Sequence, residues 1–210
     1  MTRTQILDIH ESQAIPKAKE IIKAGGIIAF PTDTIYGVAG DMFNPQAINA
    51  IYRIKERSKL KAIPVLIGDI QQLEVLVLGV DDRTIKIAET FWPGPLTLVL
   101  PKKPAIPKEL SPYPTIGVRM PNHKFTLALL RSTGPLATTS ANISGDENPR
   151  TCQDVINQLG GRIDLVLDGG TTPGSTASTV VDVSSKTFKL LREGPISLKD
   201  IHALFDEDNQ

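Results

Sequence analysis

The sequence predicts an α/β protein with a sheet at its core. Short apolar runs alternate along the chain with amphipathic segments, which is the pattern of an α/β or α+β protein. Most of the 16 glycines and 16 prolines fall between those runs and separate them. The 210 residues contain no linker-like stretch and no repeat of fixed period, so we expect one compact domain spanning residues 1–210.

The first elements carry clear local signals. Residues 13–23 are predicted to form a helix, because apolar side chains recur every three or four positions until Gly25-Gly26 ends the pattern. Residues 26–30 read as a buried strand that runs into the polar segment 31–37, a place where sheet proteins present functional side chains. Asn44 then caps a helix that starts at Pro45 and ends near Lys55.

The remaining chain continues the alternation. Strands are expected at residues 63–67, 96–100, 116–120, 136–139, 165–167, 179–183 and 188–191, each bounded by glycine, proline or charged residues. Helices are expected at residues 83–90, 124–130, 152–159 and 198–204, and the acidic tail 206–210 is expected to fray.

Composition excludes several classes of protein. Lysine plus arginine and aspartate plus glutamate both total 23, so the whole chain has no excess charge to attract nucleic acid or a lipid surface. No run approaches the ~18 apolar residues of a membrane-spanning helix. The single cysteine, Cys152, cannot form an internal disulfide, and the N-terminus lacks a signal-peptide pattern. We therefore expect a cytoplasmic protein without membrane contacts.

The most unusual local pattern is a run of cations at every second position. In an extended segment their side chains would share one face at a spacing of roughly 7 Å, which suits a triphosphate or another polyanion. A solvated helix end, where basic residues complement the helix dipole, is the alternative that charge pattern alone favours. The cations are Arg53, Lys55, Arg57, Lys59 and Lys61.

Other polar residues are candidates for ligand contacts. Ser140 and Asn142 follow an apolar run two positions apart, so in an extended segment they would point the same way; a turn with local hydrogen bonds is equally consistent. Arg119 interrupts an apolar strand and needs solvent, an acidic partner or a bound anion, yet no acidic residue adjoins it in sequence. The loop 169–179, rich in glycine and hydroxyl residues, is either an anion cradle or an ordinary surface loop.

Several standard sites are not supported. A serine triad would have to use His123, and no Gly-x-Ser-x-Gly elbow accompanies it. One cysteine and three scattered histidines show no zinc-ligand spacing. Neither a Walker A loop nor a Gly-x-Gly-x-x-Gly turn is present, so a nucleotide would bind in another way.

Seven segments in order make the chain resemble the YrdC/Sua5 family, the threonylcarbamoyl-AMP synthases. Each segment alone is weakly specific, but the ordered set covers nearly the whole chain, with the core at about residues 13–205. The chain resembles the short, single-domain members. The segments are 31–37 (PTDTIYG), Lys55-Glu-Arg57, 92–97 (WPGPLT), 117–121 (GVRMP), Ser140-Ala-Asn142, 178–182 (STVVD) and Arg192-Glu-Gly194.

The resemblance implies a twisted mixed sheet flanked by helices, with a concave basic face that binds ATP and L-threonine side by side. The reaction would join threonine, bicarbonate and ATP into L-threonylcarbamoyl-AMP and release pyrophosphate, for the t6A modification of tRNA. Mg²⁺ would be carried by the ATP phosphates without ligands from the protein. A separate tRNA threonylcarbamoyl transferase complex would use the product.

The resemblance also implies roles for individual residues. Lys55 and Arg57 would face the ATP phosphates as the catalytic cations, and Arg119 would pair with the threonine carboxylate. Tyr36 is either a wall of the pocket or a core aromatic, and residues 92–95 suggest a structural corner. The ATP-binding set is Lys55, Arg57, Lys61, Thr115, Ser140, Asn142, Asn148 and Arg192, and the threonine-binding set is Thr34, Arg119, Thr138 and Ser178.

One departure from the family and two other functions stay open. Leu66 stands where many relatives carry a histidine that contacts threonine. A basic concave face would also suit a protein that binds double-stranded RNA or tRNA, although zero net charge argues against high affinity. The third hypothesis is a paralogue that adenylates another carbamate or carbamoyl donor.

Overall fold

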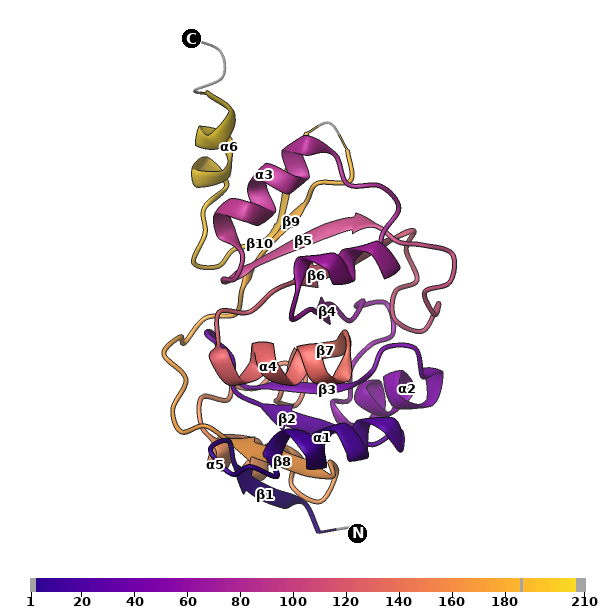
Figure 1. Ribbon diagram of the computed structural model, residues 1–210, viewed down its shortest axis with the longest axis vertical. Coiled ribbons are helices and arrows are strands. Elements are labelled where there is room, and N and C mark those ends of the chain that lie inside the picture. Colours follow the sequence, from indigo (N-terminus) through magenta and orange to yellow (C-terminus); the bar gives the residue numbers. More distant parts are fainter. Residues whose placement is uncertain (1–2, 186, 207–210) are drawn as a thin grey trace.

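The computed structural model describes residues 3–185 and 187–206 and contains one ten-stranded mixed sheet. The strand order is β1-β8-β2-β3-β7-β4-β6-β5-β9-β10, and the strands succeed one another along the long axis of the molecule (Figure 1). The strands are β1 Gln5–Asp8, β2 Ile28–Phe30, β3 Gly37–Asp41, β4 Val65–Leu66, β5 Leu96–Pro101, β6 Thr115–Arg119, β7 Leu136–Ser140, β8 Leu165–Asp168, β9 Thr179–Asp182 and β10 Lys189–Arg192.

The described residues form seven helical segments, six of them between strands and the seventh after β10. The helices are α1 Ala14–Lys23, α2 Pro45–Ile54, the 3₁₀ helix η1 Ile70–Val75, α3 Asp82–Phe91, α4 Lys124–Thr133, α5 Cys152–Leu159 and α6 Leu198–Asp206 among the described residues. Four pairs are parallel (β1 with β8, β8 with β2, β4 with β6, β5 with β9) and the other five are antiparallel, so the sheet is mixed, as expected.

Both faces of β2, β3 and β8 are buried, because these strands alternate their side chains between two apolar clusters. Ile28 and Phe30 of β2 pack in the cluster that α1 and α4 cover. Ala29, between them, packs in the larger cluster with Ile48 and Ile51 of α2. This two-sided burial explains why the strands read in the sequence as continuous apolar runs rather than as alternating ones.

The predicted elements are confirmed, with shifts of a few residues at their ends, and three elements are additional. Strand β1 lies at an edge with mostly exposed side chains, so it shows little apolar pattern. Strand β3 contains Gly37 and Gly40, which lower strand propensity. A Cβ at Gly40 would lie 2.8 Å from Cδ1 of Ile27, so close packing requires the glycine. The third is η1. Asp206, predicted as the first residue of the frayed tail, is the last residue of α6, and residues 207–210 lie outside the described residues.

Of the two readings of the cation run at residues 53–61, the extended face does not hold, and Arg53 lies at the helix end that the charge pattern favoured. Arg53 lies within α2, which ends at Ile54, and the next turn contains Glu56 with a positive φ of 53°. Because the chain turns at Glu56, the side chains of Lys55 and Arg57 point in different directions, and that of Lys55 is buried. No described helix is long and apolar enough to cross a membrane.

Asn44 caps α2 as predicted and thereby fixes the helix that leads into Lys55 and Arg57. Its side-chain oxygen accepts hydrogen bonds from the backbone N–H groups of Gln46 (2.9 Å) and Ala47 (3.3 Å). We expect Asn44→Ala to lower the free energy of unfolding by about 1 kcal/mol, because these donors lose their partner. Urea unfolding measures the change. Asn44→Asp is the control and should match the wild type; an unchanged alanine variant would contradict the capping role.

Candidate functional site

A cavity of about 1260 Å³ lies over one face of the sheet, at the strands β5, β6, β7 and β9. Alternate residues of β5, β6 and β9 form its floor, while the residues between them point into the apolar core on the other face; β7 instead contributes the consecutive residues Thr138, Thr139 and Ser140. Thr97 and Val99 of β5 therefore face the cavity, and Leu98 faces the core. The other floor residues are Thr115, Gly117 and Arg119 of β6, Thr138 of β7, and Val180 and Asp182 of β9.

Loops and one edge strand build the walls. They come from the segment 32–37, the segment 57–64 after α2, the loop 111–114, residues 177–178 and β10. A register irregularity between Leu190 and Arg192 interrupts the alternation of β10, and the neighbours Leu191 and Arg192 both line the cavity. Segments far apart in the sequence thus meet around one space.

The lining is rich in cations. Asp182 is the one carboxylate among the described lining residues, against the cations Arg57, Lys61, Arg119, Lys189 and Arg192. Burial and the nearby guanidinium groups of Arg119 and Arg57 lower the pKa of Arg192. Since arginine nevertheless stays protonated in proteins, the cavity favours an anionic ligand that can neutralise these charges.

Arg119 is held from three sides. Its Nε donates to the carbonyl of Gly94 (2.9 Å), and its Nη1 donates to Oγ1 of Thr34 (3.0 Å). Its Nη2 forms an ion pair with Oδ1 of Asp33 at 2.5 Å. Burial lowers the pKa of Arg119, and the charge of Asp33 opposes that effect. A guanidinium has five N–H groups, so two remain for a ligand.

The ion pair with Asp33 supplies the acidic partner that the sequence left open for Arg119. The acidic partner exists, but it lies 86 residues earlier in the chain, in the polar segment that follows β2. Sequence reasoning missed Asp33, the partner of Arg119 beside the cavity lining, although its segment was singled out. It also assigned no role to the lining residues Thr97, Asp182 and Lys189. Three strands separate β2 from β6 in the sheet, so the contact depends on the path of the loop after β2 and not on strand pairing or on any local pattern.

The structure brings together most of the residues proposed for the site. Arg192 is fixed in the cavity wall by two bonds to the carbonyl of Ser178 (3.0 and 2.7 Å) and one to its Oγ (3.0 Å). Arg57 donates to the carbonyls of Lys61 (3.1 Å) and Ala62 (3.0 Å). The proposed residues that line the cavity are Thr34, Arg57, Lys61, Thr115, Arg119, Thr138, Ser140, Ser178 and Arg192.

Three proposed residues lie elsewhere. Lys55 is 1% exposed and lies outside the cavity lining, with its ammonium bonded to the carbonyls of Ser140 (2.5 Å) and Asn142. Asn142 directs Oδ1 to the same ammonium (3.3 Å) and Nδ2 to the carbonyl of Asp146, so it does not form a ligand pair with Ser140. Asn148 is exposed and is also absent from the lining.

The expected wall and corner are both present. Tyr36 lines the cavity and is also fully buried; its hydroxyl accepts from the N–H of Gly169 (3.0 Å) and donates to the carbonyl of Gly170 (2.8 Å). Trp92 donates through Nε1 to the carbonyl of Leu96 (2.7 Å), which stabilises the corner. That corner also supplies the Gly94 carbonyl to Arg119.

The geometry does not support a serine triad that uses His123 or a metal site. His123 caps α4 by accepting from the N–H of Thr126 at 3.4 Å, and burial lowers its pKa. Across residues 3–185 and 187–206, no three His, Cys, Asp or Glu side chains cluster as metal ligands would.

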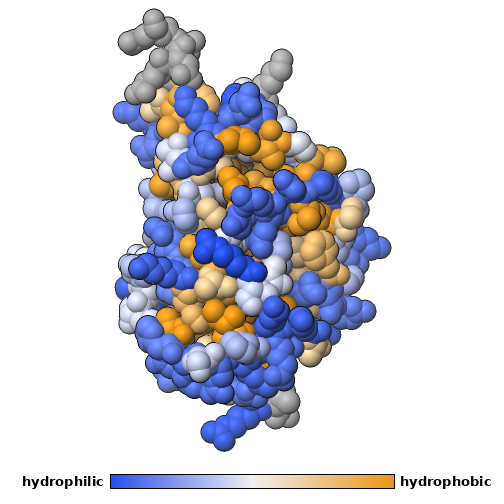
Figure 2. All heavy atoms as spheres, viewed as in Figure 1, coloured by the Kyte–Doolittle hydropathy of each residue, from blue (hydrophilic) through white to orange (hydrophobic). Residues whose placement is uncertain are grey.

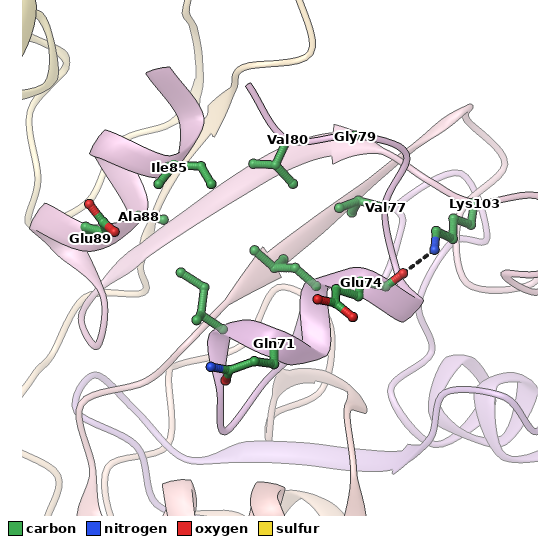
Figure 3. A pocket seen from close by; sticks show the side chains of 11 residues that line it. Gln71, Glu74, Val77, Gly79, Val80, Ile85, Ala88, Glu89 and Lys103 are labelled. Atoms are coloured by element: carbon green, nitrogen blue, oxygen red, sulfur yellow. Dashed lines mark hydrogen bonds between the residues drawn. The ribbon is translucent and has the colours of Figure 1, made fainter. Parts of the chain in front are cut away.

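A second cavity of about 630 Å³ lies between η1 and α3 (Figure 3). Aliphatic side chains such as Leu73, Val77 and Ala88 line it, and Lys103 donates to the carbonyl of Glu74 at one end. Figure 2 shows hydrophobic residues gathered over this region of the viewed face. It lacks the convergent cations of the larger cavity, which is therefore the candidate site.

Comparison with known proteins identifies the family. The model of the Sua5, YciO and YrdC proteins, described as telomere recombination, matches residues 20–194. The chain belongs to this family. A Mycobacterium tuberculosis relative is 36% identical over 94% of this chain and 91% of its own length. A Bacillus subtilis threonylcarbamoyl-AMP synthase is 37% identical over 90% of this chain.

Solved structures of the family share the fold. The crystal structure of Pyrococcus abyssi Sua5 complexed with L-threonine superimposes with a TM-score of 0.90 at 34% identity, covering 99% of this chain. The chain spans 61% of that protein and 56% of the Bacillus subtilis one. The expected family and the mixed α/β fold are thus confirmed. Leu66, the departure from the family pattern, lines the cavity beside Arg119 in the β4–β6 register.

The buried Lys55 predicts a measurable pH effect on stability. Burial lowers its pKa from 10.5 to about 7. Above pH 7 the folded state therefore releases a proton that the unfolded state retains, so the free energy of unfolding should rise with pH, by at most ~1.4 kcal/mol per unit from this group. Below pH 7 both states hold the proton and the contribution is constant.

Urea unfolding at pH 7, 8 and 9 checks this by comparing the wild type with Lys55→Met. The variant should be less stable overall, because two buried carbonyls lose their donor. In this variant the free energy of unfolding should not show the rise with pH above pH 7 that Lys55 contributes in the wild type. Burial raises the pKa of Cys152 to about 11, but that contribution is common to both proteins and cancels. Equal slopes in the two proteins would show that Lys55 keeps its ordinary pKa.

Proposed function

We propose that this protein is an L-threonylcarbamoyladenylate synthase, which joins L-threonine, bicarbonate and ATP and releases pyrophosphate. The observation that carries the proposal is one cavity in which three guanidinium groups, those of Arg57, Arg119 and Arg192, converge beside a cluster of buried hydroxyls. The name of the Bacillus subtilis relative and the threonine complex of Pyrococcus abyssi Sua5 support it.

The threonine end of the cavity lies at Arg119. The two free N–H groups of its guanidinium suit a carboxylate, which takes two parallel hydrogen bonds from arginine. Thr34, Thr138 and Ser178 are buried around it and supply hydroxyl groups that a polar side chain such as that of threonine can bond. A buried hydroxyl pair, Ser178 Oγ and Thr97 Oγ1 at 2.8 Å, already occupies the floor between the strands.

The nucleotide end lies toward Arg57, Lys61 and Arg192. Fixed cations at these places would neutralise the triphosphate as negative charge shifts onto the leaving pyrophosphate. Thr115 and Ser140 would contact the nucleotide from the floor and the wall. Mg²⁺ would enter bound to the ATP phosphates and would screen their charge.

The chemistry needs position and charge more than a nucleophilic side chain. The threonine amine combines with bicarbonate to give a carbamate and water; a carbamate oxygen then attacks the α-phosphorus, and pyrophosphate leaves. The cavity holds the two reactants next to each other, which removes the entropic cost of their encounter. The labile carbamate also has to be kept from water, which the bound nucleotide would do by covering it.

Lys55, Asn142 and Asn148 receive different roles in this proposal. Lys55 fixes the backbone at Ser140 and Asn142 and so acts as a positioning residue for the nucleotide wall. Asn142 completes the cage around the Lys55 ammonium. The ATP-binding role of Asn148 stays a prediction, and no contact supports it.

The wider setting is also proposed. The product would pass to a tRNA threonylcarbamoyl transferase complex in the cytoplasm, where the modification takes place. Direct binding of tRNA or double-stranded RNA is not favoured, since the chain has no net charge to drive it. A paralogue acting on another carbamoyl donor would need the same cavity and differs in its substrate preference.

Pyrophosphate release by the purified protein tests the proposal. With ATP and Mg²⁺, release should require both L-threonine and bicarbonate, and serine should support it poorly. Serine lacks the threonine methyl, a difference worth roughly 1–3 kcal/mol in a fitted pocket. Release that is independent of threonine would contradict the proposal, and ATP binding without release would direct the search to another acceptor.

Two arginine variants should separate the two ends of the site. Arg119→Ala should raise the KM for threonine by at least about thirtyfold and leave the KM for ATP near the wild-type value, because loss of a buried charge partner costs about 2–5 kcal/mol. Arg57→Ala should instead impair ATP turnover. Arg57→Lys controls for charge, since it keeps a cation but loses the bonds to Lys61 and Ala62. If either alanine variant has unchanged kinetics, the substituted arginine does not contact the substrate, which would contradict its assigned role.

A further inference from the structure

We propose that the groove between η1 and α3 is a docking surface for an amphipathic helix of a partner protein, with basic residues beside the apolar face of that helix. This groove is the smaller cavity, of about 630 Å³. It lies apart from the candidate site, and the inference does not depend on the proposed function. An apolar groove receives the apolar face of a helix through side chains spaced three or four positions apart.

The groove leaves apolar surface uncovered. Ile85 lines it and has 39% of its surface exposed; Val75 and Leu78, next in sequence to lining residues, are 51% and 50% exposed. A Cβ at Gly79, another lining residue, would meet no atom within 4 Å, so the groove is open there. Exposed apolar side chains that gather at one place, as Figure 2 shows for this face, mark interaction surfaces.

Backbone hydrogen bonds hold the η1 wall against β5. The N–H of Leu78 donates to the carbonyl of Pro101 (2.9 Å). The N–H of Lys103 donates to the carbonyl of Leu76 (2.9 Å). Both bonds join the segment after η1 to the chain at the end of β5. The groove is therefore formed before an occupant arrives, which lowers the ordering cost of binding.

Unpaired carboxylates lie on both walls of the groove. Glu74 is on the η1 side and Glu89 on the α3 side (Figure 3), both are exposed, and neither carboxylate has a partner in the described chain. The ammonium of Lys103 donates to the carbonyl of Glu74 and is the one cation among the described lining residues. Two carboxylates against one ammonium give the groove a net negative charge, which favours basic residues on the occupant.

Two cations of α3 are turned away from the groove. The guanidinium of Arg83 lies over the ring of Phe188, 5.5 Å from its centroid, and the ammonium of Lys86 lies 5.5 Å from the ring centroid of Phe205. Phe205 belongs to α6, and Phe188 packs against it with 5.5 Å between the ring centroids. These cations therefore do not neutralise the carboxylate on the groove side of α3.

Charge also disfavours an occupant from this chain. The C-terminal segment 206–210 carries the carboxylates of Asp206, Glu207 and Asp208, which the acidic groove would repel. Pairing of two copies through this groove would bring both acidic rims into one symmetric interface. A basic helix of another protein meets neither penalty.

Docking here would leave the candidate site accessible. Leu73 of the groove lies in the same core cluster as Leu98 of β5. Thr97 and Val99, on the other face of that strand, line the larger cavity. The groove and the candidate site thus lie on opposite faces of β5, and an occupied groove should leave the KM for ATP and threonine unchanged.

Fluorescence anisotropy with labelled helical peptides tests the proposal. The basic probe has about 18 residues, or roughly five turns, with leucine at positions i, i+3, i+4 and i+7 and lysine on the other face. The acidic probe has glutamate in place of each lysine, and a scrambled probe keeps the basic composition without an apolar face. The protein should bind the basic probe at least about tenfold more tightly than either of the others.

Two variants place binding in the groove. Ile85→Gln should weaken binding of the basic probe at least about tenfold, because it removes an apolar anchor without adding charge. Glu74→Lys combined with Glu89→Lys should reverse the preference, so that the acidic probe binds more tightly. Phe43→Gln is the matched control: Phe43 is also exposed (48%) but lies outside the groove, so this variant should match the wild type. Urea midpoints verify that each variant is folded.

The proposal is overturned if the charge-reversed variant still prefers the basic probe, or if the wild type does not prefer that probe or binds it with a Kd above about 1 mM. It is also overturned if sedimentation shows wild-type dimers that Ile85→Gln dissociates, because a second copy would then be the occupant. The charge-reversed variant changes two exposed residues, so it decides the question even if Ile85→Gln does not fold. None of these results bears on pyrophosphate release.

Discussion

A permanently charged guanidinium sits inside the sheet, and the surrounding structure is arranged to compensate it. Arg119 takes acceptors from two other parts of the chain: Asp33 and Thr34 after β2, and the Gly94 carbonyl before β5. Breaking any of these contacts would leave a buried charge or dipole without its partner, so the segments are held in fixed positions relative to β6. The site exists because this charge has to be satisfied by residues distant in sequence.

Strand alternation imposes the second constraint. Every second residue of β5 and β6 belongs to the apolar core, so those between them are restricted to the cavity floor. A shift of one residue in register would bury Arg119 in the core and expose Val118 to the ligand. The stability of the sheet and the composition of the floor are therefore set by the same register, in which Val118 pairs with Leu98.

Much of the fold could be predicted because its signals are local. The Asn44-Pro45 start of α2 and the apolar runs of the central strands each lie within a few residues. Strand β3 escaped prediction because its two glycines lower strand propensity and reflect tertiary packing, Gly40 against Ile27 and Gly37 against Thr138. The extended reading of the cation run fails for a related reason: periodicity describes a regular segment, and the turn at Glu56 ends that regularity. Lys55 and Asp33 have partners 85 to 87 positions away, which no local pattern reveals.

The irregular register of β10 has a consequence for how this cavity could change. The strand lies at the end of the sheet and pairs with β9 alone, so its irregularity disturbs no further neighbour. An insertion or deletion in β10 would alter which side chains reach the rim, where Leu191 and Arg192 now lie, without shifting the floor. Divergence in ligand preference within such a fold can thus proceed through length changes at the outer strand, while the inner strands tolerate only substitution.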